Sequence, residues 1–389
     1  MTKIRKLACV LTKYSYGQKD YGLSPEYNAI YKPLKKKFKN LKLYNSLKSK
    51  NINKNNLDLI NFCKKNKPDF LFFSVYNFEF YLETLNYLRK KLGIKLINWS
   101  SDDSWRFDQH SKIISNHFDV MVTTSSDAYN YYKKNNKKSI LTSWGCPDDW
   151  FKIPKKSAKC QRDIIFIGQK YFDREKIVKH LRKTFKVDCY GRGWENKSLK
   201  DNQVPNFLRN SKISLNFSKS RGNKKQTKAR VFEICGSGSL CISENSPELR
   251  SFYSNSEVIS FDNTKQLTYI IKNYLKNSAQ RDKVAFKANK KTKKKYSYSE
   301  IQNSIIFKIK KFKFTEKKNQ IIKKTLLSLF IKYIFLFFMR ITYNILIIFI
   351  KKKLVIKIVR RFFFELEWRM RGEKTYTKLG ACNVFFNSF

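Results

Sequence analysis

The chain has 389 residues and a formal net charge of +52, from 82 Lys and Arg residues against 30 Asp and Glu. With 42% hydrophobic and 16% aromatic residues, the composition excludes a largely disordered chain and supports two ordinary domains plus an extension. The charge indicates either an anionic partner or simply a lysine-rich solvated surface. No zinc-finger spacing, basic zipper or RNA-recognition motif occurs, so nucleic acid is not expected as a partner.

Eight cysteines are scattered along the chain without a Cys-x-x-Cys pair, which is typical of buried thiols in a reducing compartment. The three histidines form no cluster with cysteines or carboxylates at metal-ligand spacing, so neither a metal nor another cofactor is expected. The apolar run at residues 7–11 is too short for a signal peptide, and a cytosolic protein is therefore expected.

Strands and helices alternate along the first 150 residues. Helices are predicted at 25–34, 57–65 and 80–92, and strands at 6–12, 41–44, 68–74, 95–99 and 118–123. Apolar strands separated by helices are typical of a parallel sheet with crossover helices. Residues 1–150 are therefore predicted to form a Rossmann-like domain.

A stretch rich in Pro and Lys at 147–159 separates this domain from a second alternating series. Strands are predicted at 163–168, 187–191, 213–217, 240–242 and 257–261, and helices at 173–184, 204–209 and 264–275. The series predicts a second Rossmann-like domain over residues 160–312, followed by a basic, apolar extension at 313–389. Two such domains predict a ligand site in the cleft between them.

The whole chain is organised around residues 228–244, which read as a helix, a glycine break and a short apolar strand. In such α/β units, ligands bind near strand ends and helix N-termini. Glu233 could accept hydrogen bonds from ribose hydroxyls, while Gly236 and Gly238 would let backbone N–H groups approach a phosphate. The alternative is that Glu233 is a surface residue and the glycines merely cap the helix.

This stretch resembles the helix–Gly–strand segment of group 1 glycosyltransferases, nucleotide-sugar enzymes with the GT-B fold. The resemblance rests on Phe232-Glu233-x4-Gly238, followed by an apolar strand. The wording Arg230-x-Phe-Glu-Ile-x-Gly-x-Gly is similar to the branch that includes CgeB-like spore-maturation proteins. Group 1 enzymes carry another Glu eight residues earlier, where this chain has Lys225. The resemblance covers roughly residues 5–310 and implies hexosyl transfer without a metal, on two Rossmann-like domains.

The resemblance also implies which residues meet the nucleotide-sugar donor. Group 1 enzymes follow the strand-end Gly with an Arg, and a Lys comes five residues later; here those positions are Gln169 and Arg174. Arg174 and Arg230 would hold the diphosphate and Glu233 the ribose, although solvated surface remains the alternative for either arginine. The expected donor-binding residues are Gly168, Arg174, Arg230, Glu233, Gly236 and Gly238.

The candidate catalytic residues lie in Asn98–Trp105, at the end of an apolar strand. Acids at such a position face the ligand site of α/β proteins. Asp102 or Asp103 could orient an acceptor hydroxyl or act as a general base, and helix N-capping is the alternative. A similar W-x-S-D-D element occurs in CgeB-like proteins. His110 and His117 fall in a predicted helix and are expected to be structural.

The C-terminal extension contains an apolar stretch at 326–350 that is long enough to span a bilayer. Lys332 and Arg340 lie inside it and both flanks are basic, which favours a helix at an anionic membrane interface. Spanning the membrane and docking on the protein's own surface remain alternatives. The sequence predicts a glycosyltransferase of surface polysaccharide synthesis, acting on a glycan or lipid-linked acceptor at the inner membrane face. A non-catalytic membrane-associated protein of the same fold, or a basic nucleic-acid binder, is the alternative.

Overall fold

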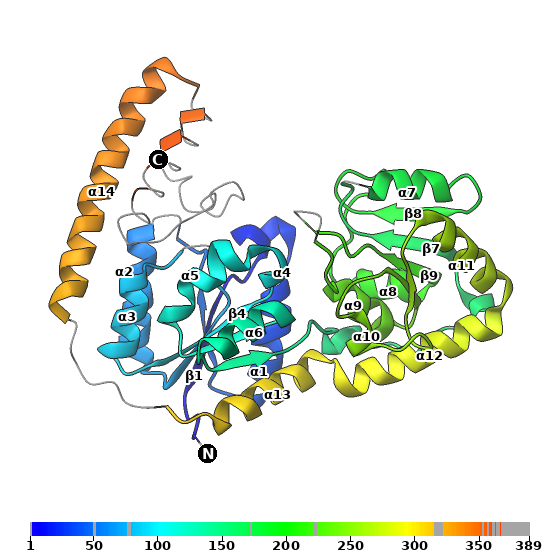
Figure 1. Ribbon diagram of the computed structural model, residues 1–389, viewed down its shortest axis with the longest axis horizontal. Coiled ribbons are helices and arrows are strands. Elements are labelled where there is room, and N and C mark those ends of the chain that lie inside the picture. The colour runs from blue at the N-terminus through cyan, green and yellow to red at the C-terminus, as the bar shows by residue number, and fades with distance from the viewer. Residues whose placement is uncertain are drawn as a thin grey trace. The chain divides into compact units, whose positions relative to one another are not determined.

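The computed structural model describes residues 2–49, 52–75, 79–171, 173–220, 224–314, 322–351, 354–355, 358–359, 362 and 366. They form two α/β units, whose sheets are seen in blue to cyan and in green in Figure 1. The first unit contains Met1–Tyr27, Leu34–Leu141 and Ile306–Phe389, and the second contains Asn28–Pro33 and Thr142–Ile305.

The first unit is built on a six-stranded parallel sheet in the order β2-β1-β3-β4-β5-β6. Ala8 and Val10 pack into the core on one face, and Cys9 and Leu11, which alternate with them, are buried as well. Burial on both faces explains why the strands are continuous apolar runs. The strands are β1 (Leu7–Leu11), β2 (Lys42–Asn45), β3 (Phe70–Phe73), β4 (Lys95–Ser100), β5 (Val120–Thr123) and β6 (Ser139–Leu141).

Helices follow the strands of this sheet as crossover connections. Leu85 and Leu88 of α3 and Tyr132 of α6 belong to the same core as the buried face of β3. The sequence predicted the helices before β3 and β4, but neither α6 nor β6. The helical segments are α1 (Lys32–Lys37), α2 (Ile52–Asn66), α3 (Leu82–Lys90), α4 (Asp103–Arg106), the π-helical η4 (Phe107–Ser111), α5 (Lys112–Ile114) and α6 (Ser126–Lys134).

The second unit has a five-stranded parallel sheet in the order β11-β10-β9-β7-β8. Its strands are β7 (Arg162–Ile167), β8 (Val187–Tyr190), β9 (Ser211–Asn216), β10 (Leu240–Glu244) and β11 (Ile259–Phe261). Ile164 and Phe166 pack against α7 and α11 on one face, whereas Ile165 packs against α8 and α9 on the other. The helices are α7 (Arg174–Leu181), α8 (Val204–Arg209), α9 (Ala229–Ser237), α10 (Leu249–Phe252) and α11 (Thr264–Lys276).

Two long helices, α12 (Ser278–Lys295) and α13 (Tyr298–Lys311), follow the second sheet. Arg281 of α12 is fully buried and binds three main-chain carbonyl oxygens, those of Lys155 at 2.8 Å, Ser211 at 3.1 Å and Lys212 at 2.7 Å. It also pairs with Asp282 at 2.6 Å. The guanidinium therefore fixes the polar connection before β7 onto β9 and α12.

The extension begins with α14 (Ile322–Phe349), which lies beside α3 of the first unit (Figure 1). Met339 and Tyr343 of α14 are buried against Val355 and Val359, which belong to helical residues further along the chain. Within the part of the chain that the structure describes, no helix is both long and apolar enough to cross a membrane.

Candidate functional site

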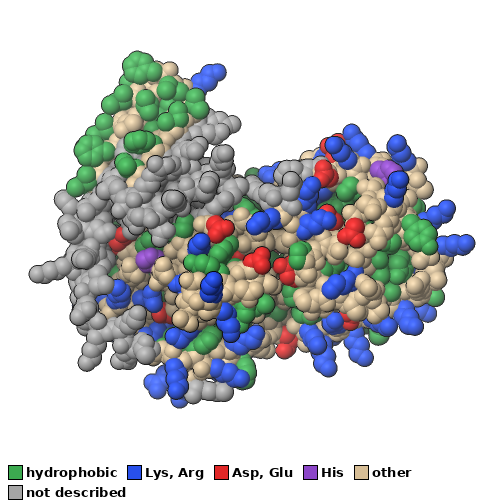
Figure 2. All heavy atoms as spheres, in the orientation of Figure 1, with side chains coloured by type: hydrophobic (Ala, Val, Ile, Leu, Met, Phe, Trp, Pro, Cys, Tyr) green, Lys and Arg blue, Asp and Glu red, His purple; other side chains and the backbone are tan. Residues whose placement is uncertain are grey.

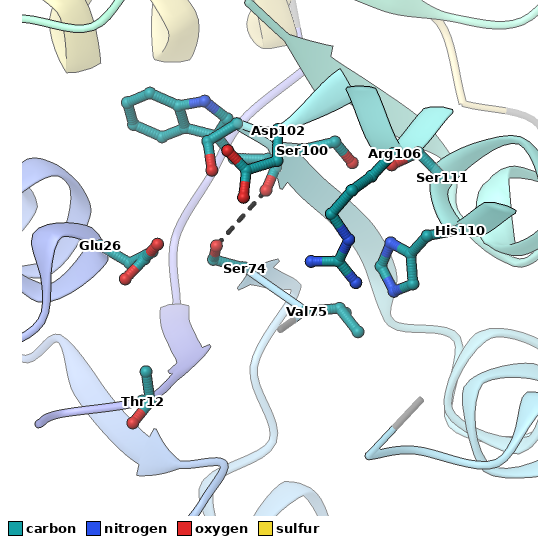
Figure 3. Close-up of a pocket in the computed structure, with 11 residues that line it drawn as sticks. Thr12, Glu26, Ser74, Val75, Ser100, Asp102, Arg106, His110 and Ser111 are labelled. Carbon is teal, nitrogen blue, oxygen red and sulfur yellow. Dashed lines mark hydrogen bonds between the residues drawn. The ribbon is translucent and has the colours of Figure 1, made fainter. Parts of the chain in front are cut away.

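A polar cavity lies in the first unit, where three neighbouring parallel strands end (Figure 3). Thr12 follows β1, Ser74 follows β3, and Asp102 comes two residues after β4. The volume open to the centres of water-sized molecules is about 40 Å³, enough for about three ordered waters or a bound hydroxyl group. The lining residues are Thr12, Glu26, Ser74, Val75, Trp99, Ser100, Ser101, Asp102, Arg106, His110 and Ser111.

A buried asparagine fixes the strand ends that form the cavity floor. Asn98 of β4 accepts a hydrogen bond from the main-chain N–H of Val75 at 3.1 Å and donates one to the Ser100 hydroxyl at 2.8 Å. The Ser74 hydroxyl donates to the Trp99 carbonyl at 3.4 Å (Figure 3). The ends of β3 and β4 are therefore linked by side chains beyond the sheet ladder, which holds the hydroxyl groups of the cavity in place.

The two predicted catalytic acids have different environments. Asp102 lines the cavity and occupies the N-cap position of α4, but its side chain makes no capping hydrogen bond. Asp103 is buried, accepts a hydrogen bond from the Thr123 hydroxyl at 2.6 Å, and is not among the lining residues. Burial raises the pKa of Asp103 to about 7, against the opposing effect of the Ser111 and Thr123 hydroxyls. The structure thus separates a carboxylate that faces the cavity from one that is held beneath it.

Three further ionisable side chains line the cavity and were not among the predicted site residues. Figure 3 shows Glu26 on one side and Arg106 and His110 on the other, with Asp102 near Ser100 above them. His110, expected to be structural, is buried and is also part of the cavity wall. Asp102, Arg106 and His110 follow one another at intervals of four residues, the spacing of one helix face. That spacing is the sequence signal that could have identified them.

In the second unit, Gly168 and Arg174 lie at the carboxyl end of β7. The Gly168 carbonyl accepts a hydrogen bond from the Trp194 indole at 3.0 Å, and Gly191 comes so close that a Cβ on it would lie 2.4 Å from that oxygen. Arg174 donates to the Gln169 carbonyl at 2.9 Å and stacks over the Tyr171 ring at 4.1 Å. Burial lowers the pKa of Arg174, so its guanidinium is partly desolvated beside the strand end.

Arg230 and Glu233 form an ion pair one turn apart on α9, with 2.8 Å between Arg230 Nη1 and Glu233 Oε2. Both side chains keep some exposure, 24% and 16% respectively. Burial raises the pKa of Glu233; Arg230 opposes this and Asp201 adds to it. Glu233 is therefore neither a freely solvated surface residue nor fully enclosed, and its carboxylate is held in place by an arginine.

The two glycines after Glu233 serve the packing of α9. A Cβ on Gly236 would lie 2.3 Å from Cys146 Sγ and 3.1 Å from the Phe151 ring. Gly238 has φ 87° and ends the helix in the left-handed conformation that favours glycine. These contacts account for both glycines within the unit, and the predicted approach to a phosphate stays a prediction.

Lys225, which stands where group 1 enzymes have their first Glu, is paired with the carboxylate of Glu244 at the carboxyl end of β10. Its Nζ lies 3.2 Å from Glu244 Oε1, and the other oxygen of Glu244 accepts hydrogen bonds from the main-chain N–H groups of Ser218 and Lys219. Glu244, at the end of β10, was not predicted as a site residue. It binds Ser218, Lys219 and Lys225 after β9, and its charge acts to raise the pKa of Arg174.

Comparisons with known proteins agree with this architecture. Residues 174–306 match a family model described as glycosyl transferase-like, and no curated protein matches the chain. Sucrose-phosphate synthase from Thermosynechococcus elongatus is similar in structure, with a TM-score of 0.61, 8% identity, and coverage of 78% of this chain and 99% of that one. HepE from Anabaena, in complex with UDP-glucose, is also similar in structure. Its TM-score is 0.59 at 8% identity, and the match covers 79% of this chain and 100% of that one.

A third similar structure is the DNA-modifying enzyme β-glucosyltransferase, with a TM-score of 0.51, 13% identity, and coverage of 78% of this chain and 99% of that one. Identities this low establish similarity of fold. The predicted fold class, GT-B with two Rossmann-like domains, is confirmed.

Proposed function

We propose that this chain is a glycosyltransferase that moves a sugar from a nucleotide-activated donor to a hydroxyl group of a glycan or lipid-linked acceptor. The main observation behind the proposal is that the segment that matches the glycosyl transferase-like family model also contains the Arg230–Glu233 ion pair. The complex of a fold neighbour with UDP-glucose supports a nucleotide sugar as donor. The motif around Glu233 supports the CgeB-like branch of group 1 enzymes, and with it hexosyl transfer without a metal.

The donor roles follow from the charge that develops in the reaction. A departing diphosphate needs cations, and ribose hydroxyls need a fixed hydrogen-bond acceptor. Arg174 and Arg230 would supply the cations. The guanidinium of Arg174 is partly buried after the carboxyl end of β7, and that of Arg230 is partly buried on α9. Glu233, already oriented by Arg230, would accept from the ribose. Asp102 would orient the acceptor hydroxyl in the cavity of the first unit.

The test is binding of nucleotide sugars and free nucleotides to the full chain, followed by calorimetry on Glu233→Ala. A lost hydrogen bond to a charged group predicts about a 10- to 100-fold weaker Kd. Glu257→Ala is the matched control, because Glu257 is also 16% exposed and pairs with Lys291 at 2.8 Å. Unchanged donor affinity in a folded Glu233→Ala chain would remove Glu233 from the site.

The other functional classes give different results in the same experiment. A chain that melts cooperatively and responds to no nucleotide is a non-catalytic protein that keeps the fold. A chain that binds any duplex, with affinity falling steeply as salt rises, is a nucleic-acid binder. Selective stabilisation by one nucleotide sugar and its nucleoside diphosphate supports the enzyme.

The extension supports association with the cytoplasmic face of an anionic membrane, as part of the same proposal. Seven exposed apolar side chains of α14 lie in one stripe at helical spacing, and Ile347 is exposed outside it; the seven are Ile334, Phe337, Phe338, Ile341, Ile345, Ile348 and Phe349. They make up the green surface at the upper left of Figure 2. Leu354, Ile358 and Phe362 repeat this pattern after α14. The residues between them are rich in Lys and Arg, which favours anionic lipid as the occupant of this apolar face. A surface polysaccharide or its lipid-linked precursor is the acceptor that such a location fits.

The membrane proposal is tested by co-sedimentation with vesicles that contain phosphatidylserine. Phe337→Ser with Phe349→Ser should reduce binding by at least about 10-fold, because each ring contributes up to about 1.5–3 kcal/mol when buried. Phe286→Ser is the control, since Phe286 is 57% exposed on α12, which belongs to the second unit and not to the extension. Equal binding by all three chains, or binding that is the same without the anionic lipid, would contradict the proposal.

A further inference from the structure

The segment of the second unit that follows β9 folds back on itself as a basic flap, which consists of residues 218–220 and 224–228. Lys219 and Lys225 form an antiparallel bridge, and the Ser220 N–H donates a hydrogen bond to the opposite half of the flap at 2.7 Å. Four of these eight residues are lysines and none is acidic. The flap therefore brings a local excess of positive charge to the carboxyl end of β9.

One buried carboxylate fastens both halves of the flap to the sheet. Glu244 ends β10, and its side chain is 13% exposed. One of its oxygens accepts hydrogen bonds from the N–H groups of Ser218 at 2.9 Å and Lys219 at 3.1 Å. The other oxygen lies 3.2 Å from Lys225 Nζ. Such charge-assisted bonds are the strong ones in proteins, so Glu244 is the anchor of the flap.

Lys219 extends the flap to the neighbouring strand end. Its Nζ lies 2.6 Å from Asp173 Oδ2, and Asp173 precedes Arg174 at the start of α7. The strands β10, β9 and β7 are neighbours in the parallel sheet, so their carboxyl ends share one edge. The flap and Arg174 therefore lie together at the edge where α/β proteins bind their ligands.

We propose that Glu244 is a positioning residue for the donor, which holds the basic flap so that Lys219 and Lys225 face the donor diphosphate together with Arg174. This inference rests on the proposed function. Each ammonium has three N–H donors, and the two lysine side chains keep 31% and 37% exposure, so each can bind a phosphate oxygen while it stays paired. A flap that is fixed before the donor arrives lowers the ordering cost of binding.

The competing explanation is that Glu244 only neutralises Lys225, in which case any ion pair at these two positions would serve. The two main-chain N–H groups distinguish the explanations, because an ion pair does not need them. A lysine ammonium has no acceptor for an N–H group. The reversed pair, Lys225→Glu with Glu244→Lys, would therefore restore the attraction between the two side chains but not the anchor of the flap.

The experiment uses the full chain with UDP and uridine as probes, and with ADP, GDP and their nucleosides in the same way. Calorimetry gives the Kd of the diphosphate, and displacement of the diphosphate gives that of the nucleoside, which reports on the fold and the rest of the donor site. Glu244→Ala should weaken UDP binding about 10- to 100-fold, because bonds to a charged group are lost, and leave uridine within about threefold.

Two further variants test how Glu244 acts. Glu244→Gln keeps an oxygen acceptor for the two N–H groups, so its Kd for UDP should stay within about threefold of wild type. The reversed pair should bind UDP as weakly as Glu244→Ala. Recovery of UDP affinity in the reversed pair, or a Glu244→Gln chain as weak as Glu244→Ala, overturns the anchoring role of Glu244.

Glu257→Ala is the matched control. Glu257 accepts a hydrogen bond from the Ser254 N–H at 2.8 Å and pairs with Lys291 at 2.8 Å, but it precedes β11 and so lies at the opposite end of the sheet. It should leave both Kd values within about twofold. A folded Glu244→Ala chain that keeps its UDP affinity, or loses UDP and uridine affinity equally, overturns the role of Glu244 alone. A wild-type chain that binds none of the nucleoside diphosphates overturns the proposed function as well.

Discussion

Gly236→Ala tests whether Gly236 is needed for the packing of α9 or for binding the donor, two roles that the sequence cannot distinguish. The added methyl would lie 2.3 Å from Cys146 Sγ and 2.9 Å from Cys146 Cβ, against about 3.5–4.0 Å for a relaxed contact. Cys146 cannot easily retreat, because its N–H donates to Tyr296 at 2.9 Å and its carbonyl accepts from Tyr298 at 3.0 Å. Overpacking of this kind costs about 1–3 kcal/mol, and the higher helix propensity of Ala returns up to about 1 kcal/mol.

We therefore expect Gly236→Ala to destabilise the second unit by about 2 kcal/mol, which lowers its Tm by about 4–8 °C for a unit of this size. Thermal unfolding followed by tryptophan fluorescence measures the change. Ser237→Ala, at the next and equally buried position, adds no atom and serves as the control. Cys146→Ala in the Gly236→Ala background should restore part of the loss, because it removes the nearest atom. An unchanged Tm together with lost nucleotide affinity would refute the packing argument and favour the donor role.

Two further predictions concern buried charge. Arg281→Met should destabilise the second unit by about 3–5 kcal/mol, because it removes a fully buried guanidinium that binds three carbonyls and pairs with Asp282. Denaturant unfolding measures this, and the exposed Lys179→Met should change it by less than about 0.5 kcal/mol. The second concerns Asp103, whose pKa of about 7 exceeds the unfolded value of about 3.9. The folded state then binds more protons, so stability falls as pH rises from about 4 to about 7. Asp103→Asn should flatten this decline in Tm, leaving the part due to the other acids whose pKa is raised, Glu26, Asp201 and Glu233; an unchanged slope would contradict the raised pKa of Asp103.

The sheets could be read from the sequence because burial on both faces produces uninterrupted apolar runs, such as Leu7–Leu11 and Ile164–Ile167. Neither α6 nor β6 was predicted. The β6 strand is only Ser139–Leu141, at the edge of the sheet, and Leu141 is exposed. The helix α6 is short and carries a polar outer face. Edge elements bury less surface, and their apolar pattern is correspondingly weaker.

The candidate site shows a similar division. Asp102 could be predicted, because an acid two residues after a buried strand faces the ligand side of a parallel sheet. Glu26 could not, since Ser24-Pro25-Glu26 reads as an ordinary helix start and only the fold brings it to the same cavity. The neighbouring acid Asp103 looked equivalent to Asp102 in sequence, and only its hydrogen bond to Thr123 separates the two.

The high positive charge of the chain makes the position of Glu26 and Asp102 unusual. With 82 basic residues against 30 acidic ones, a carboxylate can readily pair with a lysine. Asp163, Glu244 and Glu257, in or near the sheet of the second unit, do so. Glu26 and Asp102 instead line one cavity, where the charge of Asp102 adds to burial in raising the pKa of Glu26. Keeping two carboxyl groups together costs folding free energy that a pair with lysine would avoid. Such a cost persists where the groups act on a ligand, which is why the cavity, rather than the basic surface, is the place where we expect the acceptor to bind.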